Sequence, residues 1–410
     1  MPKDNIPEIR VAGFSEVQWS KKKCEDLLTE RNVQHPQSEE YPLVSFTIED
    51  GVTPKTERYE RESLVAGDKN AKKYKETRLN DIVYNPANLK FGAIARNKYG
   101  NAVFSPIYVT FDVNENFAVP EFVEVLVSKK DFIQDALQYQ KGTVYERMSV
   151  CSTDFLNLDV KIPSVAEQRQ IGSIFERLDA LISQHQHKHE ALVAVKKAML
   201  EKMFPKEGEN VPEIRFVGFT DPWEQRKLGD CFTERVESMP DGELISVTIN
   251  DGIKKFSELG RHDNSNDDKS KYKKVCVGDI AYNSMRMWQG ASGYSPYEGI
   301  VSPAYTVLSP NSGINSKCLA YQFKLPEIIH TFQVNSQGIT SDNWNLKYPA
   351  LSQIEIFVSK DEQEQAKIAK YFENLDNLIT LHQRKCEVLK NLKSALPHCS
   401  ARCLYKFIVF

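Results

Sequence analysis

The chain lacks any run of about 18 apolar residues, which is the length that a membrane-spanning helix needs. Its first residues also lack the apolar stretch of a secretory signal peptide, so we expect a cytoplasmic protein without a membrane partner. Its eight cysteines include no C-x-x-C pair, which favours reduced thiols over a zinc finger or a disulfide framework. The formal net charge is only −3, so any contact with nucleic acid must come from local basic clusters.

Sequence motifs that carry catalytic chemistry are missing as well. There is no G-x-x-x-x-G-K-[ST] loop for a nucleotide, no G-x-S-x-G and no H-E-x-x-H. The segment Asn85-Pro86-Ala87-Asn88 is similar to the catalytic loop of amino-methyltransferases, but the second proline and the aromatic residue of that loop are absent. We therefore expect a recognition protein, with no catalytic residues, no metal ligands and no cofactor of its own.

What the chain does contain is an internal repeat that spans about half its length. The repeated segments are Ile6-Pro7-Glu8-Ile9-Arg10 and Val211-Pro212-Glu213-Ile214-Arg215, Asp81-Ile82-x-Tyr84-Asn85 and Asp279-Ile280-x-Tyr282-Asn283, and Glu167-Gln168-x-x-Ile171 and Glu364-Gln365-x-x-Ile368. A period this long exceeds the repeat of a solenoid and indicates a duplicated domain. The molecule should therefore present two similar surfaces.

We predict an α+β fold with two similar globular domains separated by two long helices, which form an antiparallel coiled coil. The predicted parts are residues 1–160 (first domain), 161–205 (first helix), 206–357 (second domain), 358–397 (second helix) and 398–410 (a tail without counterpart in the first copy). Strands are expected at residues 43–48, 82–84, 103–111, 244–249 and 300–308, and shorter helices at residues 121–140 and 317–334. Pro397 is expected to end the second long helix.

The two long helices carry matching start signals and matching apolar seams. Ser164 with Glu167 has the form of a capping box, and Asp361 with Glu364 stands at the same place in the second copy. The predicted seams are positions 171, 174, 178, 181, 185, 188, 192, 195 and 199, and positions 368, 371, 375, 378, 382, 385, 389, 392 and 396. Four polar residues at their midpoints, His185, Lys188, His382 and Lys385, are expected to fix the register of the pair. A zinc site that adds His189 and Cys386 is the weaker alternative.

A basic cluster with a central tyrosine stands at the same place in both copies. The clusters contain Lys73, Tyr74, Lys75 and Arg78 in the first copy, and Lys271, Tyr272, Lys273 and Lys274 in the second. A run of charge is most often a solvated loop, whereas its recurrence around an aromatic residue favours contacts with phosphates. The clusters alone leave both interpretations open.

Longer segments of the chain resemble the specificity subunits of type I restriction–modification systems. The resemblance is carried by Asn283–Ser295 and Gly299–Val307, by the two Glu-Gln-x-x-Ile helices and by the junction Val211–Phe219. It implies that each of two target-recognition domains reads one half of a split DNA sequence. It also implies that the paired helices hold the domains apart and dock two methyltransferase subunits, with restriction subunits joining the assembled complex. S-adenosylmethionine and ATP with magnesium then belong to the partner subunits.

Two equal-length segments are where the two domains are expected to read different bases of double-stranded DNA. The segments between Asn85 and Gly92 and between Asn283 and Gly290 differ at every position. Their candidate DNA-contacting residues are Asn88 and Lys90 in the first and Arg286 and Gln289 in the second, whereas Met285, Met287 and Trp288 could equally belong to the core. The alternative function is a bivalent coiled-coil scaffold that joins two protein partners without reading DNA.

Overall fold

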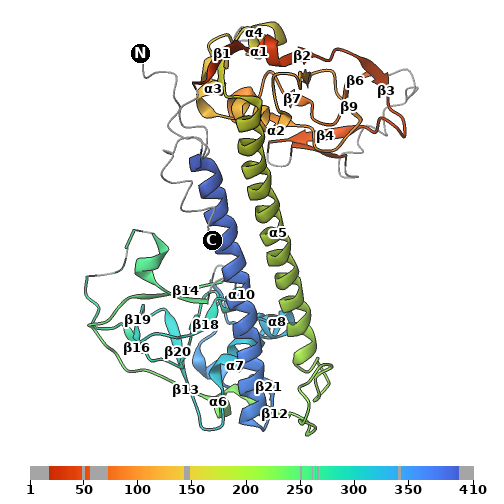
Figure 1. Cartoon of the computed structure of the whole chain (residues 1–410). Coiled ribbons are helices and arrows are strands. Elements are labelled where there is room, and N and C mark those ends of the chain that lie inside the picture. Colours follow the sequence, from red (N-terminus) through yellow and green to blue (C-terminus); the bar gives the residue numbers. More distant parts are fainter. Residues whose placement is uncertain are drawn as a thin grey trace. The chain divides into compact units, whose positions relative to one another are not determined.

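The structure is a computed structural model that describes residues 18–48, 51–55, 73–142, 148–249, 252–260, 262–263, 265, 267–339 and 343–396. The chain divides into two compact units, residues 1–185 with 385–410 and residues 186–384. The long helices α5 (Val165–Met203) and α10 (Glu362–Ala395) each contribute to both units (Figure 1). Each unit therefore combines one globular domain, the first part of one long helix and the last part of the other.

The first unit contains short strands and helices in a mixed order. Its strands are β1 (Ser20–Lys23), β2 (Leu28–Glu30), β3 (Gln34–Pro36), β4 (Val44–Thr47), β5 (Gly51–Pro54), β6 (Lys73–Thr77), β7 (Ile82–Tyr84), β8 (Ile94–Arg96), β9 (Ala102–Phe104), β10 (Val109–Val113) and β11 (Asp159–Ile162). Its helices before α5 are α1 (Cys24–Leu27), the 3-10 helix η3 (Leu89–Phe91), α2 (Pro120–Val127), α3 (Lys130–Leu137) and α4 (Ser152–Leu156).

The second unit repeats this order. Its strands are β12 (Glu224–Lys227), β13 (Phe232–Glu234), β14 (Ile245–Thr248), β15 (Gly252–Lys255), β16 (Lys273–Val275), β17 (Ile280–Asn283), β18 (Ser292–Tyr294), β19 (Gly299–Val301), β20 (Tyr305–Pro310) and β21 (Glu355–Val358). Its helices before α10 are α6 (Leu228–Cys231), η4 (Phe256–Leu259), η5 (Met287–Gln289), α7 (Ser316–Gln322), α8 (Pro326–Val334) and α9 (Tyr348–Leu351).

Sheet topology shows that the sequence repeat is a fold repeat. A four-stranded antiparallel sheet has the order β2-β10-β7-β8 in the first unit and β13-β20-β17-β18 in the second. A two-stranded ladder, β1 with β11 and β12 with β21, joins the two ends of each domain. The predicted α+β class is confirmed.

Several predicted elements are divided in two. The expected strands at residues 103–111 and 300–308 are each interrupted at a Ser-Pro pair, Ser105-Pro106 and Ser302-Pro303, because proline cannot donate a hydrogen bond to a neighbouring strand. The expected helix at residues 317–334 becomes α7 and α8, and Pro326 stands at the start of α8. The expected helix at residues 121–140 likewise divides into α2 and α3.

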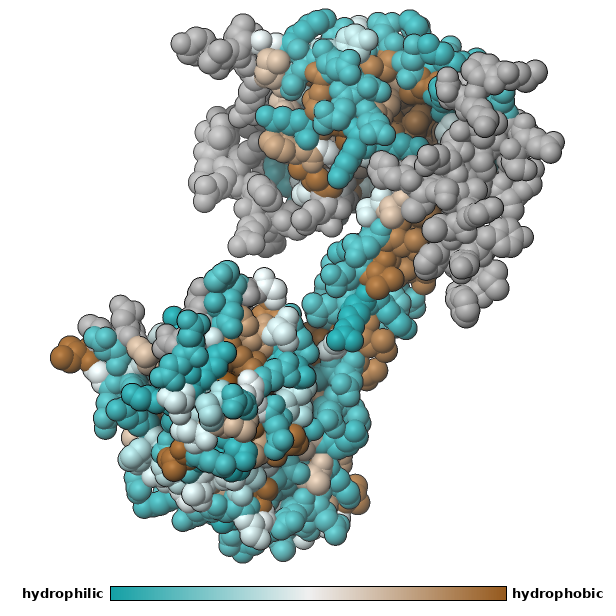
Figure 2. All heavy atoms as spheres, turned by 90° about the vertical axis from the view of Figure 1, so that its left-hand side faces the viewer, coloured by the Kyte–Doolittle hydropathy of each residue, from teal (hydrophilic) through white to brown (hydrophobic). Residues whose placement is uncertain are grey.

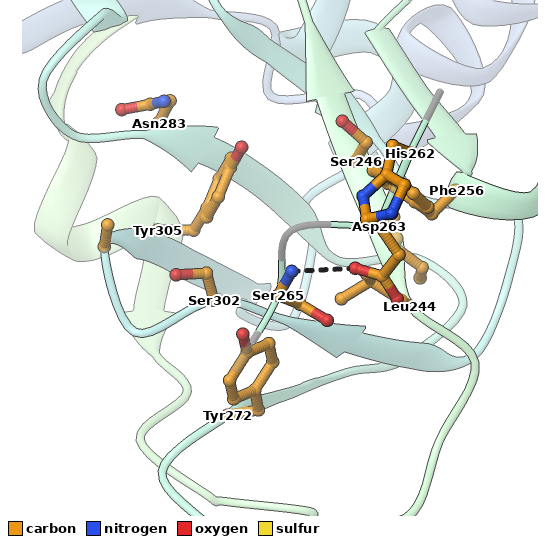
Figure 3. Close-up of a pocket in the computed structure, with 12 residues that line it drawn as sticks. Leu244, Ser246, Phe256, His262, Asp263, Ser265, Tyr272, Asn283, Ser302 and Tyr305 are labelled. Atoms are coloured by element: carbon orange, nitrogen blue, oxygen red, sulfur yellow. Dashed lines mark hydrogen bonds between the residues drawn. The ribbon is translucent and has the colours of Figure 1, made fainter. Parts of the chain in front are cut away.

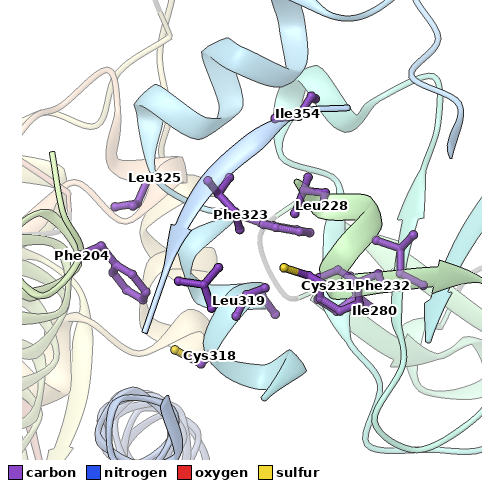
Figure 4. Close-up of a cluster of buried hydrophobic side chains, with 14 of the residues drawn as sticks. Phe204, Leu228, Cys231, Phe232, Ile280, Cys318, Leu319, Phe323, Leu325 and Ile354 are labelled. Carbon is purple, nitrogen blue, oxygen red and sulfur yellow. The ribbon is translucent and has the colours of Figure 1, made fainter. Parts of the chain in front are cut away.

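Each domain has its own apolar core, and the beginning of a long helix belongs to it. In the first unit, Tyr84, Phe111 and Phe155 stack with ring centroids 5.0–5.7 Å apart. In the second unit, Phe204, which follows α5, and Phe372 of α10 pack in the same core as Phe232 and Phe323 (Figure 4). Because these large side chains are fully buried in one cluster, the helices and the domain of the second unit form a single packed body.

The repeated Glu-Gln motif docks each long helix on its domain. The Gln168 amide donates to the carbonyls of Phe117 and Pro163, and its oxygen accepts from the Val119 amide. In the second unit, Gln365 makes the same three bonds with Gly313, Ser359 and Asn315. Both glutamines are buried, so these bonds satisfy polar groups that water cannot reach.

Both long helices begin at the predicted caps. Ser164 Oγ accepts from the Glu167 amide at 3.4 Å, and Asp361 Oδ1 accepts from the Gln363 amide at 2.7 Å. The Glu364 side chain, which stands at the capping-box position of α10, bonds to other parts of the domain. Its buried carboxylate accepts bonds from Arg215, Trp223 and Ser359, because the repeated Arg215 segment folds back onto the start of α10.

Of the eighteen predicted seam positions, only Leu181, Lys188, Val195, Leu378 and Lys385 are exposed. The less exposed positions include Ile171, Ile174, Phe175, Leu178, Ile182, His185, His189, Leu192, Lys196, Met199 and Met203 in α5, and Ile368, Tyr371, Phe372, Leu375, Ile379, His382, Cys386, Leu389, Leu392 and Lys393 in α10, with Leu396 just after it. The prediction that Lys188 and Lys385 lie in the seam is wrong, because both side chains are exposed. Leu181 and Ile182 are adjacent and both apolar, so the sequence pattern alone admits either set of steps.

In each unit the two long helices meet in antiparallel fashion. In the first unit, Lys393 near the end of α10 pairs with Asp179 of α5 at 2.5 Å. In the second unit, Lys196 in the last part of α5 pairs with Asp376 of α10 at 2.5 Å. Late turns of one helix therefore contact early turns of the other in both units. In the described part of the chain, no helix is long and apolar enough to cross a membrane.

Candidate nucleic-acid interface

Two loops with the same backbone shape connect β7 to β8 and β17 to β18. In each loop an asparagine side chain, Asn85 or Asn283, accepts a hydrogen bond from a main-chain amide two residues later. Each loop then forms a 3-10 turn and ends at a glycine with positive φ, 83° at Gly92 and 79° at Gly290. We call residues 85–92 and 283–290 the first and second recognition loops. Their common backbone lets them present different side chains from equivalent positions.

The first recognition loop exposes polar, basic and aromatic side chains. Leu89 is fully buried and anchors the loop to the core, whereas Asn88 and Lys90 are exposed. Phe91 is 62% exposed, and the Lys90 ammonium lies 4.8 Å from the centre of its ring. Amide and ammonium groups with this exposure can reach base edges or phosphates.

The second recognition loop uses a buried methionine in place of Leu89. Met287 has no exposed surface, so it belongs to the core and is not available for contact with DNA. The Arg286 guanidinium lies 3.4 Å from the Gln289 amide oxygen, which brings together the two candidate residues of this loop. Trp288 packs edge to face against Trp344 at 5.3 Å, and Met285 is exposed. The loop thus presents an arginine and a glutamine on a rigid aromatic support.

The basic cluster of the first domain divides into a buried and an exposed part. Tyr74 and Lys75 are buried on β6, and the Lys75 ammonium pairs with Glu30 at 2.9 Å. Arg78 is about half exposed and pairs with Glu76, whereas Lys73 is exposed at the start of the strand. Lys75 is therefore directed to the protein interior, and Lys73 is the residue of this cluster that faces solvent most openly.

The second cluster has the same arrangement. Tyr272 is buried, Lys273 lies 3.4 Å from Glu234, and Lys274 lies 3.1 Å from Glu237. Lys271 is exposed. Acidic side chains on and after β13 therefore engage two of the three lysines, which the sequence could not reveal because Glu234 is far away along the chain.

Two pockets, of about 630 Å³ and 380 Å³, lie on the second unit, and the larger one lies beside the second recognition loop. Figure 3 shows that its wall includes Asn283 at the start of the loop, Tyr305 of β20 and Tyr272. Its other lining residues are Leu244, Ile245, Ser246, Phe256, His262, Asp263, Ser265, Ser302 and Ala304. The described part of this wall contains hydroxyl, amide and aromatic groups, the His262 imidazole and the Asp263 carboxylate, but neither lysine nor arginine, so it does not suit a phosphate.

Two equivalent ion pairs lie at the start of β7 and β17, at the opposite end of each strand from its recognition loop. The Arg31 guanidinium donates two hydrogen bonds to Asp81, and Arg235 does the same to Asp279. The aspartates precede β7 and β17 directly, and the arginines follow β2 and β13. Burial raises the pKa of Asp81, while Arg31 opposes that shift. The repeated Asp-Ile pair was the sequence signal for these two ion pairs.

The long helices carry apolar side chains that neither domain covers. Figure 2 shows apolar surface along the part of the molecule formed by these helices. The exposed apolar residues of α5 and α10, each at least 41% exposed, are Leu181, Val193, Val195, Leu378, Leu381 and Val388. Two of these, Leu181 and Leu378, occupy the same position in the two copies of the repeat. Such residues on a long helix suit contact with a partner protein.

The described residues include no group of three or more His, Cys, Asp or Glu side chains arranged to hold a metal ion. His185 and His382 are half-buried in the helical seams and make contacts there.

Comparison with known proteins points to one family. Residues 220–391 match the sequence profile of the type I restriction modification DNA specificity domain. No curated protein sequence matches the chain.

Two solved structures align with nearly the whole chain. The S subunit of a type I restriction-modification system from M. genitalium is 14% identical, with a TM-score of 0.59, over 95% of this chain and 97% of that one. The HsdS subunit from Thermoanaerobacter tengcongensis is 16% identical, with a TM-score of 0.44, over 94% and 97%. The profile match thus covers the second half of the chain, residues 220–391, and the fold of the whole chain is similar to that of the M. genitalium S subunit.

Proposed function

We propose that this chain is the DNA-recognition subunit of a type I restriction–modification complex and that each domain reads one half of a bipartite, asymmetric target. The observation that carries this proposal is the pair of recognition loops, which share a backbone and differ in every intervening side chain. A common backbone docks both domains on a duplex in the same way. Different side chains then select different bases, so the two half-sites differ in sequence.

The exposed polar residues of the loops are the proposed base readers. Arg286 with Gln289 can bind a guanine or adenine edge in the major groove, and Asn88 with Lys90 offers the corresponding groups in the first domain. Lys73 and Lys271, exposed at equivalent places in the repeat, are the proposed phosphate contacts. Lys75, Lys273 and Lys274 are assigned to internal ion pairs instead, and Tyr74 and Tyr272 to the core.

The long helices are proposed to form one antiparallel coiled coil that spaces the domains. The ion pairs between Asp179 and Lys393 and between Asp376 and Lys196 support this, because the same contact occurs once in each unit. An antiparallel pair has a two-fold axis across it, so it carries the two domains to equivalent positions on two half-sites. His185 and His382, half-buried near the helix midpoints, are proposed to fix the register.

The uncovered apolar residues of the helices are the proposed docking sites for two methyltransferase subunits. Leu181 and Leu378 occupy equivalent positions, as two identical partners require. Restriction subunits then join through the assembled complex, and S-adenosylmethionine and ATP with magnesium bind to the partners.

The test is methylation mapping of the chain co-expressed with its methyltransferase subunit. Single-molecule sequencing of host DNA should show methylated adenines in one two-part target with a fixed spacer. Purified alone, the chain should neither methylate nor cleave DNA nor hydrolyse ATP. A complex that assembles but binds all DNA sequences equally in a gel-shift assay would instead support the protein–protein scaffold.

A further inference from the structure

A lysine reaches the end of the second recognition loop from the connection between α7 and α8. The Lys324 ammonium donates hydrogen bonds to the carbonyls of Gly290 at 2.6 Å and Ser292 at 2.8 Å, and to that of Ile249 at 3.3 Å. Gly290 ends the recognition loop and Ser292 begins β18, while Ile249 follows β14. One side chain therefore joins three segments that are 32 to 75 residues away from it in sequence.

The connection that carries Lys324 is itself fixed. Phe323 and Leu325, on either side of it, are buried and point into the core of the second unit (Figure 4). An ammonium has three N–H donors, and the three carbonyls satisfy all of them. Burial, together with the ammonium of Lys196 on α5, lowers the pKa of Lys324 to about 8. The charge of this half-buried lysine is thus held by carbonyl dipoles.

The glycine at the end of the loop is enclosed from the other side. A Cβ atom on Gly290 would lie 3.0 Å from Ile329 Cδ1 of α8, so the loop passes closely between α8 and Lys324. In the first domain a Cβ atom on Gly92 would meet no atom within 4 Å. The second recognition loop is therefore enclosed at Gly290, whereas the first has open space at the equivalent Gly92.

The first domain has no lysine at the corresponding position. The repeat fixes which residues correspond: the main-chain amides of Val119 and Asn315 donate to the equivalent glutamines Gln168 and Gln365. Ten residues later, Lys129 and Leu325 are the N-caps of the equivalent helices α3 and α8. The residue before each N-cap is Ser128 in the first domain and Lys324 in the second, so these two correspond. Ser128 is exposed. There, Arg96 of β8 instead pairs with Glu121, Glu124 and Glu176 at 2.6–3.1 Å. The two domains anchor equivalent strands with different residues.

We infer that Lys324 is a positioning residue for DNA recognition: it fixes the end of the second recognition loop and so determines selectivity in one half-site only. This inference rests on the proposed function. Arg286 and Gln289 lie just before Gly290, so a shift of that glycine moves both side chains relative to the bases. Base-edge hydrogen bonds depend on such geometry, whereas contacts with phosphates tolerate small shifts.

The test uses the complex of the full chain with its methyltransferase subunit and DNA duplexes that carry single-base changes in either half-site. Lys324→Met keeps the length of the side chain and removes its donors. We expect it to lower discrimination by about tenfold in the half-site that Arg286→Ala also affects, with the other half-site unchanged. Lys324→Arg, which keeps a cation and its donors, should restore much of that discrimination.

A pH profile separates positioning from a general loss of stability. Discrimination in the second half-site should fall as the pH rises through about 8, because the ammonium loses its proton, and should become independent of pH in Lys324→Met. The charged group that acts on Lys324 is Lys196 of α5, which is itself paired with Asp376 of α10. Lys129→Met is the matched control, since Lys129 is a half-buried lysine of the equivalent connection whose ammonium lies 5.9 Å from the centre of the Trp19 ring.

Three outcomes distinguish the possibilities. Equal loss in both half-sites, or unchanged discrimination in an assembled Lys324→Met complex, overturns the inference. If Lys324→Met does not assemble, the Lys324→Arg variant and the pH profile of the unmodified complex decide it, and a flat profile overturns it. A wild-type complex without two-part selectivity would show that the proposed function itself is wrong.

Discussion

Asp179 of α5 and Lys393 of α10 form an ion pair in the first unit, and the internal repeat places Asp376 and Lys196 in the same relation in the second. Each aspartate also contacts its own domain, through Lys98 in the first unit and through the Tyr321 hydroxyl in the second. The aspartates therefore connect the helix pair to the domains. Their position in the sequence, directly after Leu178 and Leu375, is shared by both copies.

Reversal of one of these ion pairs should be repaired by reversal of its partner. Asp179→Lys places two cations together and should lower the free energy of unfolding, whereas Asp179→Lys with Lys393→Asp restores the attraction. Both side chains are partly exposed, so we expect a coupling energy of only about 0.5–1 kcal/mol. Urea unfolding of the two single variants and the double variant measures it. Strictly additive effects would show that the pair does not stabilise the helices.

Changes in the recognition loops should affect one half-site each. Arg286→Ala should cost about 1–3 kcal/mol of discrimination in one half-site, because it removes the hydrogen bonds to a base edge there. Lys90→Ala, at an equivalent loop of the first domain, should act on the other half-site. Binding to duplexes with single-base changes measures both effects. Unchanged preference in Arg286→Ala would return this residue to a structural role.

Exposed and buried lysines of the basic clusters should behave differently. Lys73→Ala and Lys271→Ala should weaken binding to all sequences alike and reduce the slope of log affinity against log salt by about one for each phosphate that the variant no longer binds. Lys75→Ala should leave that slope unchanged and lower the melting temperature, because it leaves Glu30 without its cation. The salt titration and the thermal scan are made on the same preparations. A reduced salt slope in Lys75→Ala would contradict the assignment.

Insertion of one heptad into each long helix should lengthen the spacer of the DNA target. Seven residues preserve the seam and add about 10 Å of helix. The domains then move apart by about three base pairs at roughly 3.4 Å each. The half-sites also rotate by roughly a quarter-turn at about 10.5 base pairs per turn, so binding to the longer target should be weaker.

Methylation mapping of the double-insertion variant gives the result directly. The same two half-sites with a longer spacer would support the helices as the ruler. Methylation with an unchanged spacer would show that they do not set the distance. A four-residue insertion in one helix is the control, because it turns the seam away from its partner and should reduce stability first.

Much of this organisation follows from the sequence by itself. The repeat, the α+β class, the caps Ser164 and Asp361 and the start of each recognition loop at an asparagine are all local patterns, and each depends on residues that are close together in the chain. The differing loop side chains were also visible, because the comparison needed only alignment of the two copies. The last segment, residues 397–410, lies outside the described residues.

Only the tertiary structure decided which of these residues face solvent. Lys73 and Lys75 are two residues apart in the same basic cluster, yet Lys75 is buried because Glu30 of β2 lies against it. The seam includes Ile182 rather than Leu181, although both are apolar, because the packing of the partner helix selects one of the two adjacent faces. Lys324 carries no sequence signal at all, since its three partners are main-chain carbonyls from distant segments. A carbonyl is present at every residue, so only the folded chain determines which carbonyls the Lys324 ammonium can reach.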